Sequence, residues 1–200
     1  EGYEWVFEEA EKVQAIEKLD GTNVSVIMED GKPKEVWARI GSDDDAIGKV
    51  PFWTKQYPWV IKGVMNAYQK GWLDNLEDGQ HFGELVGPNV GGAAEKNVNP
   101  YELEEHLFYP FQRAREVPEQ SEKEHGRLEH KTYGMYGVEY EDVQTWFMEE
   151  GLIPLFYSRR HGKGFKEMDE DEGFVEGIVF YHPETGQQAK LRKDMFPGYI

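Results

Sequence analysis

Hydrophobic and polar residues alternate along the first third of the chain, which is the pattern of half-buried β-strands. The clearest case runs from Asn23 to Glu29, and the Asp30-Gly31 pair after it is typical of a tight hairpin turn. We therefore expect the chain to open with an antiparallel meander. We predict strands, in chain order, at residues 13–18, 23–29, 35–40, 80–86, 107–111, 153–157, 174–181 and 187–191.

From Pro58 the period changes, because apolar residues from Val60 to Trp72 recur at steps of three and four. This spacing predicts a helix packed by one face, and a second amphipathic helix is expected at residues 141–150. Strands outnumber helices without alternating with them, so the pattern favours an α+β fold over a doubly wound parallel sheet. Two charged segments, 115–131 and 168–172, are expected to be exposed loops within a single domain spanning residues 1–200.

Composition excludes several classes of protein. The chain has 200 residues, of which 6 are Trp, 11 Tyr and 11 Phe, too many aromatic residues for a disordered chain. It has 0 cysteines, which rules out disulfides and thiolate chemistry. No apolar run approaches the roughly 18–20 residues that span a bilayer, and no signal peptide is visible. We expect a cytoplasmic monomer.

The charge is strongly negative, with 39 acidic and 22 basic residues and a formal net charge of −17. Such a field repels nucleic acid at long range. Three explanations remain open: solubility, a cationic partner, or adaptation to high salt, which screens repulsion. We favour salt adaptation, and a haloarchaeon or one of its viruses as the source.

Several common catalytic motifs are absent. Gly48-Lys49 is not a phosphate loop, because that motif needs glycine where the chain has Asp43 and a hydroxyl where it has Val50. The six histidines are scattered singly, and there is no Gly-x-Ser-x-Gly sequence. Zinc and serine-hydrolase chemistry are therefore not expected.

Lys18 stands at the end of an apolar strand, directly before the Asp20-Gly21 turn. Partial burial and neighbouring cations favour the free amine of a lysine, which is a nucleophile. From this segment alone, a solvent-exposed hairpin lysine is an equally good interpretation.

Two carboxylates stand in apolar, glycine-flanked strands, where an unpaired charge is costly. They are Glu84 and Glu176. Lys190 and Arg192 follow Glu176 after a turn and fall on one face of a strand, because side chains alternate with period two. We expect this hairpin to bring Glu176 near the cationic pair.

These segments resemble, in chain order, the motifs of the covalent nucleotidyltransferase superfamily, which includes ATP-dependent polynucleotide ligases and mRNA capping enzymes. The match extends from Lys18 to Lys193, and six segments in register identify the chain as a member. The segments are Lys18-Leu19-Asp20-Gly21 (motif I), Arg39-Ile40-Gly41 (the arginine motif that follows), Phe82-Gly83-Glu84-Leu85-Val86-Gly87 (motif III), Leu107-Phe108-Tyr109-Pro110-Phe111 (motif IIIa), Glu176-Gly177-Ile178-Val179-Phe180 (motif IV) and Lys190-Leu191-Arg192 (motif V).

Motif III is most similar to that of RNA ligases. The resemblance implies an α+β nucleotidyltransferase domain, ATP-grasp-like, with antiparallel sheets and flanking helices. DNA ligases and capping enzymes continue after motif V into an OB domain, whereas this sequence ends seven residues after Lys193, so we expect no OB domain. The expected activity is that of a minimal ATP-dependent RNA ligase, with a role in RNA repair.

The resemblance also implies a three-step mechanism: Lys18 takes AMP from ATP, the AMP passes to an RNA 5′-phosphate, and an RNA 3′-hydroxyl displaces it. Lys190 and Arg192 would neutralise phosphate oxygens, and Glu176 would hold Mg²⁺ or Mn²⁺. Lys193 competes with Arg192 as the second cation, because the family usually has Lys-x-Lys in motif V. The residues expected to contact the nucleotide are Glu17 (through its main chain), Asp20, Gly21, Asn23, Arg39 and Glu84, with either Phe108 or Phe111 stacked on adenine.

The densest basic stretch, residues 158–166, contains Arg159, Arg160 and Lys163. It is a candidate RNA-binding segment, because cations can contact phosphates while Phe165 stacks on a base. A surface loop neutralised by the acids that follow it is the competing interpretation.

Three other functions remain open at this point. They are a DNA nick ligase, a GTP-using capping transferase, and a nucleotide- or RNA-binding module that keeps the fold without turnover. The nucleotide that labels Lys18 and the ends that are joined would distinguish them.

Overall fold

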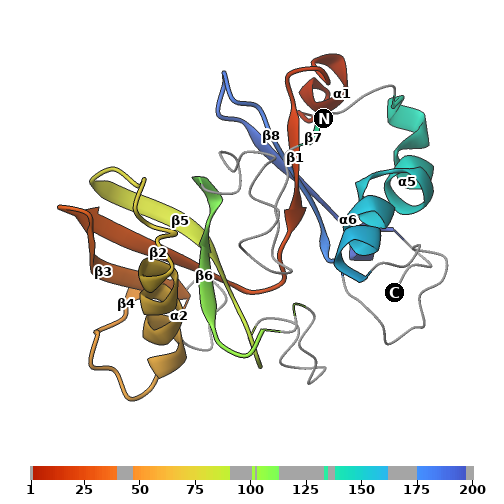
Figure 1. Ribbon diagram of the computed structural model, residues 1–200. Helices are drawn as coiled ribbons and strands as arrows, with labels where there is room; N and C mark the ends of the chain where they lie inside the picture. The colour runs from red at the N-terminus through yellow and green to blue at the C-terminus, as the bar shows by residue number, and fades with distance from the viewer. Residues whose placement is uncertain are drawn as a thin grey trace. The chain divides into compact units, whose positions relative to one another are not determined.

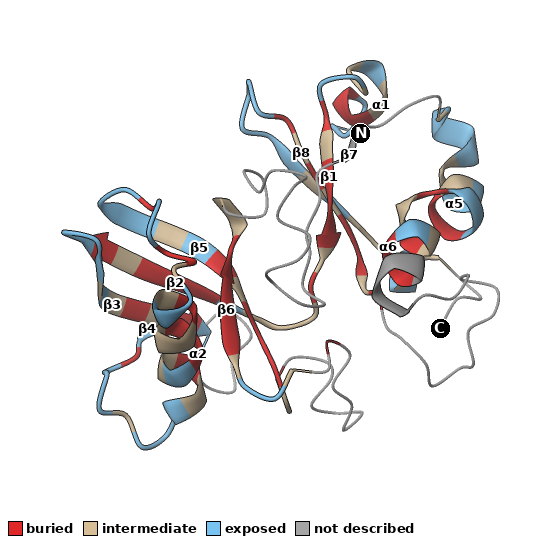
Figure 2. Cartoon of the chain, viewed as in Figure 1, coloured by how far each residue is buried: buried red, intermediate tan, exposed pale blue. Residues whose placement is uncertain are grey.

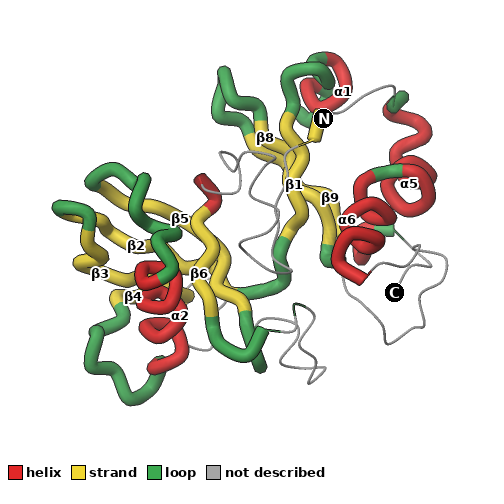
Figure 3. Tube along the Cα trace, in the orientation of Figure 1, coloured by secondary structure: helices red, strands yellow, loops and turns green. Residues whose placement is uncertain are grey.

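The computed structural model describes residues 2–39, 47–90, 101, 103–112, 133–134, 138–161 and 175–196. The chain divides into two compact units. The first comprises Glu1–Leu19 with Val117–Ile200, and the second is Asp20–Glu116. Each unit is built around its own antiparallel sheet, drawn in yellow in Figure 3.

The second unit contains a five-stranded sheet of strand order β4-β3-β2-β5-β6, in which every neighbouring pair is antiparallel (Figure 1). Asp30 and Gly31 have φ angles of 51° and 67°, so the β2–β3 connection is the tight turn that the Asp-Gly pair predicts. The strands are β2 (Thr22–Glu29), β3 (Lys32–Arg39), β4 (Ile47–Lys49), β5 (Gly79–Val86) and β6 (Leu107–Pro110).

Helix α2 (Pro58–Gln69) packs on one face of this sheet. Its buried residues follow the i, i+3, i+4, i+7 spacing of a single helix face, from Val60 to Ala67. Gly63 lies so close to Leu85 that a Cβ there would be 2.7 Å from the leucine Cδ1. Leu85 therefore points toward α2, and the side chains that alternate with it point to the opposite face.

The first unit contains a four-stranded sheet of strand order β7-β1-β8-β9, also antiparallel throughout. Its strands are β1 (Gln14–Lys18), β7 (Tyr133–Gly134), β8 (Gly177–Tyr181) and β9 (Gln188–Arg192). Its helical segments are α1 (Trp5–Glu8), η2 (Tyr140–Asp142), α5 (Val143–Thr145), the π-helical turn η3 (Trp146–Glu150), α6 (Leu152–His161) and η5 (Lys193–Met195).

The core of this unit lies between the helices and one face of the sheet, shown in red in Figure 2. Ala15, Ile178 and Phe180 come from the strands, and Phe147 and Phe156 from the helical run. Because Ala15, Ile178 and Phe180 point toward the helices, Lys18 and the even-numbered positions of β1 belong to the other face.

The predicted strand at residues 153–157 is wrong, because this segment belongs to helix α6. Its buried side chains are Ile153, Phe156 and Tyr157, which have helical spacing. Pro154 lies in the first turn, where the backbone N–H that proline lacks has no partner within the helix. A short apolar run does not separate a strand from a buried helix by periodicity alone.

The α+β fold class with antiparallel sheets is confirmed. The other predicted strands and both predicted helices are present, whereas the short elements α1, β4 and β7 were not predicted. No OB domain is evident among the described residues.

The segments 115–131 and 168–172 lie outside the described residues, and the single domain stays a prediction. Within the described part of the chain, no helix is long and apolar enough to cross a membrane.

Candidate active site

Lys18 is the last residue of β1, and its main chain pairs with Gly177 at the start of β8. The Nζ of Lys18 donates a hydrogen bond to Oε2 of Glu176 over 2.6 Å. The two side chains are 22% and 19% exposed, so the contact is largely shielded from water but open on one side. The structure thus joins the candidate nucleophile of motif I to the carboxylate of motif IV.

Two further cations lie on the same face of this sheet. Gly177 pairs with both Lys18 and Arg192, and Val179 pairs with both Ile16 and Lys190. Directly paired side chains share a face in an antiparallel sheet. Lys18, Lys190 and Arg192 therefore stand on the face opposite the helices, with the Cα atoms of Lys18 and Arg192 about 10 Å apart, two strand spacings.

Gly177 keeps the centre of this row open. A Cβ there would lie 2.9 Å from Cα of Arg192 and would also collide with the main-chain oxygen of Leu191. The glycine of motif IV is therefore required for β8 and β9 to pair this closely. It also leaves no side chain between Lys18 and Arg192.

Arg192 and Lys193 have different positions. Arg192 ends β9, and its Nε lies 3.0 Å from Oδ1 of Asp194. Lys193 begins η5, beyond the strand, and its N–H donates to the main-chain oxygen of Glu176. The face shared with Lys18 and Lys190 favours Arg192 over Lys193 as the second cation.

In the second unit, the turn after Lys18 is held by a residue that sequence reasoning missed. The N–H of Asp20 donates to the hydroxyl of Tyr101 over 2.6 Å, and Tyr101 is 1% exposed. Gly21 is packed against β5, so that a Cβ there would lie 2.8 Å from Cγ of Glu84. Nothing but its aromatic character marks Tyr101 in the sequence.

Asn23 and Glu84 are directly paired residues of β2 and β5, so their side chains share a face. The Nδ2 of Asn23 donates to the main-chain oxygen of Gly83 over 3.4 Å. Exposed Arg39 ends β3, and alternation from Trp37 puts it on the same face. We call this face, opposite α2, the open face of the second unit.

The two candidate aromatic residues for adenine differ in exposure. Phe108 is fully buried, and a Cβ on Gly83 would lie 2.6 Å from its ring. Phe111 follows β6 and is half-buried. Phe108 is thus a core residue of the second unit, which leaves Phe111 as the candidate for stacking.

Glu17 is buried at 7% exposure and pairs with Ile178, so its side chain is on the helix-covered face, away from Lys18. A role for its side chain at the face of Lys18 is therefore not favoured. Its main chain remains the candidate nucleotide contact.

The carboxylate of Glu176, which contacts Lys18, is a candidate ligand for a divalent cation. Within the described residues no group of three or more His, Cys, Asp or Glu side chains could hold a metal ion. Mg²⁺ commonly binds through one or two carboxylates together with waters and substrate phosphates. A single carboxylate in contact with Lys18 fits such an ion.

The predicted RNA-binding segment is only partly described. Arg159 and Arg160 belong to α6 by their main chain, and Lys163 lies outside the described residues. Their role stays a prediction.

Comparison with known proteins gives one family match. The family model for RNA ligase matches residues 11–194. A comparison with curated protein sequences gives no match.

Similar solved structures include variants of an RNA ligase from Naegleria gruberi. One, with AMP and Mn, is 14% identical with a TM-score of 0.51, and another, with ATP and Mn, is 15% identical with a TM-score of 0.51. Each alignment covers 94% of this chain and 52% of that one, so the chain spans about half the length of these structures. At this identity the likeness concerns the fold. Because the family model matches most of its length, the chain belongs to the RNA ligase family.

Proposed function

We propose that this chain is an ATP-dependent RNA ligase that works through a covalent lysyl-AMP intermediate on Lys18. The observation that carries the proposal is the contact between Glu176 and Lys18, which shares its sheet face with Lys190 and Arg192. A lysine beside one carboxylate and two cations suits a nucleophile that attacks a polyphosphate.

In the first step, Nζ of Lys18 attacks the α-phosphorus of ATP and forms a P–N bond. The bond from this phosphorus to the bridging oxygen breaks, and pyrophosphate leaves with the electron pair. The amine must give up protons as it bonds, so its hydrogen bond to Glu176 has to rearrange before attack. Lys190 and Arg192 neutralise the negative charge that moves onto the leaving oxygens.

In the later steps, the RNA 5′-phosphate displaces Lys18 from the AMP, and the RNA 3′-hydroxyl then displaces AMP from the activated end. Each step is a displacement at phosphorus, so the same cations serve throughout. A divalent ion such as Mg²⁺ or Mn²⁺, held by Glu176, would supply further charge neutralisation. The Naegleria gruberi structures with ATP, AMP and Mn support this choice of nucleotide and metal.

The nucleoside contacts are proposed for the open face of the second unit. Glu84 accepts hydrogen bonds from the ribose hydroxyls, Arg39 binds phosphate or ribose, and Phe111 stacks on adenine. Asp20, Gly21 and Asn23 stay proposed nucleotide contacts, and Tyr101 fixes the main chain at Asp20. We keep Arg159, Arg160 and Lys163 as proposed RNA contacts.

The test is incubation of the purified chain with ATP labelled at the α-phosphate and Mg²⁺ or Mn²⁺, followed by denaturing electrophoresis. We expect acid-labile label on the wild-type chain, none on Lys18→Ala, and a reduction on the order of 100-fold for Glu176→Gln. Glu184→Gln, a change to an exposed carboxylate paired with Lys12, is the matched control. Folded, unadenylylated protein that takes no label would disprove the proposal.

The choice of RNA is tested separately, by offering the labelled chain nicked and single-stranded RNA and DNA with 5′-phosphates. We expect the label to move to RNA ends and a joined product to form. Transfer to DNA alone would favour the nick-ligase alternative, and labelling by GTP instead of ATP would favour a capping transferase.

A further inference from the structure

One long segment of the chain carries positive charge only. Residues 47–73 contain Lys49, Lys55, Lys62 and Lys70 and no Asp or Glu, in a chain whose net charge is −17. Chance would place several acids in a stretch of this length, because Asp and Glu make up 39 of 200 residues. We call residues 47–73 the basic segment. It comprises β4, the loop after it, and α2.

The loop of this segment, residues 51–57, presents two aromatic side chains to solvent. Trp53 is 84% exposed and Phe52 is 41% exposed. Leaving an indole in water forgoes the free energy that its burial would contribute, so an exposed tryptophan with a fixed position is a candidate contact for a partner.

The loop is held in shape by its own hydrogen bonds. The N–H of Thr54 donates to the main-chain oxygen of Pro51, and Oγ1 of Thr54 accepts from the N–H groups of Gln56 and Tyr57. The side chain of Gln56 donates to the hydroxyl of Tyr57. The aromatic side chains are therefore displayed from an ordered turn, which lowers the entropic cost of binding a partner.

The lysines of the basic segment differ in how far they are neutralised. Lys49 pairs with Glu35, and Lys62 pairs with Glu105 over 2.8 Å. Lys55, in the aromatic loop, makes no ion pair with any of the residues that the structure describes. Lys55 thus lies two residues from Trp53 and is not neutralised by any described carboxylate.

β4, which precedes the loop, is an edge strand of the sheet that carries the open face of the second unit. Phe82, Ser25, Trp37 and Lys49 are successive cross-strand partners on β5, β2, β3 and β4, so they form one row on that face. Phe82 is 51% exposed, and the side chain of Lys49 is 52% exposed. β4 then leads directly into the aromatic loop. The same face carries Asn23 and Glu84, the proposed nucleoside contacts.

We propose that the aromatic loop and β4 form a docking surface for a single strand of the RNA substrate, with a base stacked on Trp53 and phosphates bound by Lys55 and Lys49. Planar rings interleaved with cations are the combination that binds single-stranded nucleic acid. The basic segment, which contains no Asp or Glu of its own, also weakens locally the repulsion that acidic residues elsewhere in the chain exert on a polyanion. This inference rests on the proposed function, since it assigns the substrate of that function to a surface.

The experiment measures binding of the full chain to a fluorescein-labelled single-stranded RNA of about 16 nucleotides, by anisotropy, without ATP and at several KCl concentrations. We expect Trp53→Ala to weaken binding about tenfold, which corresponds to the loss of one stacked base. Lys55→Gln should reduce the slope of log affinity against log salt by about 0.7, the value for one phosphate contact on a single strand.

The matched controls change similar side chains in other places. Tyr3→Ala removes an aromatic ring that is 59% exposed, and Lys34→Gln removes a lysine of β3 that pairs with Glu29. Both should bind RNA as the wild-type chain does. Circular dichroism checks that each variant is folded, and the exposure of Trp53 makes loss of the fold an unexpected result for its variant.

Unchanged binding by both Trp53→Ala and Lys55→Gln would overturn the inference, as would a wild-type chain that does not bind RNA. The inference would also be overturned if gel filtration showed that the wild-type chain self-associates through Trp53 while its RNA binding does not depend on Trp53. Labelling of the wild-type chain by ATP is measured in parallel. If ATP labels the chain but Trp53 has no role in RNA binding, the ligase proposal holds and the docking surface is wrong. If RNA binds through Trp53 but ATP does not label the chain, the docking surface holds and the ligase proposal is wrong.

Discussion

Lys18 and Glu176 come from segments 158 residues apart and meet at a hydrogen bond of 2.6 Å. Their meeting follows from strand order, because β8 lies between β1 and β9 and begins opposite the end of β1. The sequence predicts that Lys190 and Arg192 share a face, since that requires only the two-residue period of a strand. It does not predict the partner of Glu176, because strand order is a property of the whole sheet.

The two candidate aromatic residues for adenine show another limit of prediction from the sequence. Phe108 and Phe111 are equivalent in sequence, both within an apolar strand followed by a loop. Burial separates them, since Phe108 packs over Gly83 and Phe111 lies at the end of β6. A ring that fills the space above a glycine is identified only when the neighbouring strand is known.

A cluster around Glu9 makes the stability of the first unit depend on pH. Lys12 donates to Oε2 of Glu9, and buried His182 donates to the same oxygen from Nε2, since its Nδ1 accepts from the N–H groups of Glu184 and Thr185. The hydrogen bond from Lys12, followed by that from His182, lowers the pKa of Glu9 below its ordinary value of 4.5. A lowered folded-state pKa stabilises the protein above the unfolded pKa, and this stability is lost as the pH falls through the folded-state value.

We therefore predict that Glu9→Gln lowers the free energy of unfolding at pH 5.5 and that the difference from the wild-type chain shrinks as the pH approaches about 3. Urea unfolding at a series of pH values measures this. Glu11→Gln, which changes an exposed carboxylate two residues away, is the control and should follow the wild-type curve. A difference between Glu9→Gln and wild type that stays constant with pH would contradict the account.

At the scale of elements, three motif glycines have one physical role. Gly21, Gly83 and Gly177 each lie where a Cβ would collide with the main chain of a neighbouring strand or its side chains. The motifs are therefore constraints on strand packing as well as on chemistry. Motif recognition predicts these positions, but not the reason that glycine is needed there.

Gly177→Ala should destabilise the chain by about 3 kcal/mol, because the new methyl group meets the main chain of β9 at Leu191 and Arg192. Gly186→Ala, in the turn of the same hairpin, has open space around it and should cost only about 1 kcal/mol for its φ of 72°. Chemical denaturation of both variants makes the comparison. An equal loss of stability in the two variants would show that the close approach of β8 and β9 does not require glycine at position 177.

The strands were predicted better than the helix α6. β2 and β5 are each eight residues long, whereas the apolar run from Leu152 to Tyr157 is short and contains Pro154. α1, β4 and β7 have four, three and two residues, too few for any periodicity to be visible. Pattern length thus separates the elements that sequence predicts from those that it does not.

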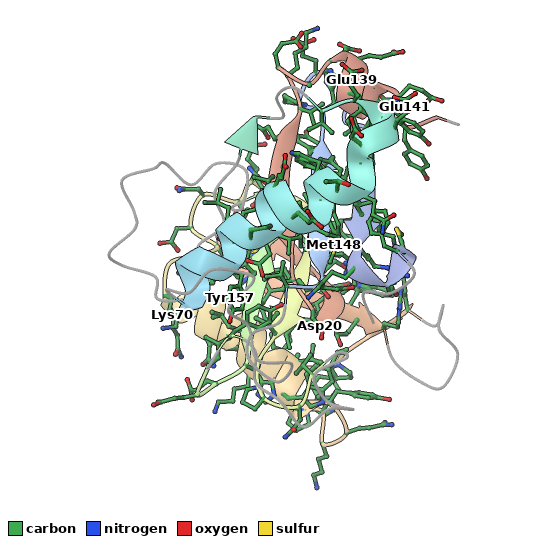
Figure 4. The ribbon with its side chains drawn as sticks, turned by 90° about the vertical axis from the view of Figure 1, so that its right-hand side faces the viewer. Asp20, Lys70, Glu139, Glu141, Met148 and Tyr157 are labelled. Atoms are coloured by element: carbon green, nitrogen blue, oxygen red, sulfur yellow. The ribbon has the colours of Figure 1, made fainter. Side chains whose placement is uncertain are left out.

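At the scale of the molecule, the net charge of −17 should oppose folding by self-repulsion. The screening length falls from about 10 Å at 0.1 M salt to about 3 Å at 1 M. Glu139 and Glu141 lie at the outer end of the helical run that continues through Met148 and Tyr157 (Figure 4), and they have no ion pair within the described part of the chain.

We predict that the melting temperature rises by about 2–4 °C between about 0.1 M and 1 M KCl, the shift that a gain of about 1 kcal/mol in the free energy of unfolding produces for a chain of this size. The double variant Glu139→Gln with Glu141→Gln should melt higher than wild type at low salt and the same at high salt. Calorimetry at several KCl concentrations tests both. A melting temperature that does not change with salt would contradict destabilisation by self-repulsion. It would also contradict the hypothesis of salt adaptation.

We propose above that Lys18 is the residue that carries AMP. The most direct measurement is intact mass spectrometry of the chain after incubation with ATP and Mg²⁺, followed by peptide mapping under conditions that preserve the P–N bond. We expect one added AMP per chain, located on Lys18 and lost in Lys18→Ala. AMP on another residue, or label that persists in Lys18→Ala, would contradict it.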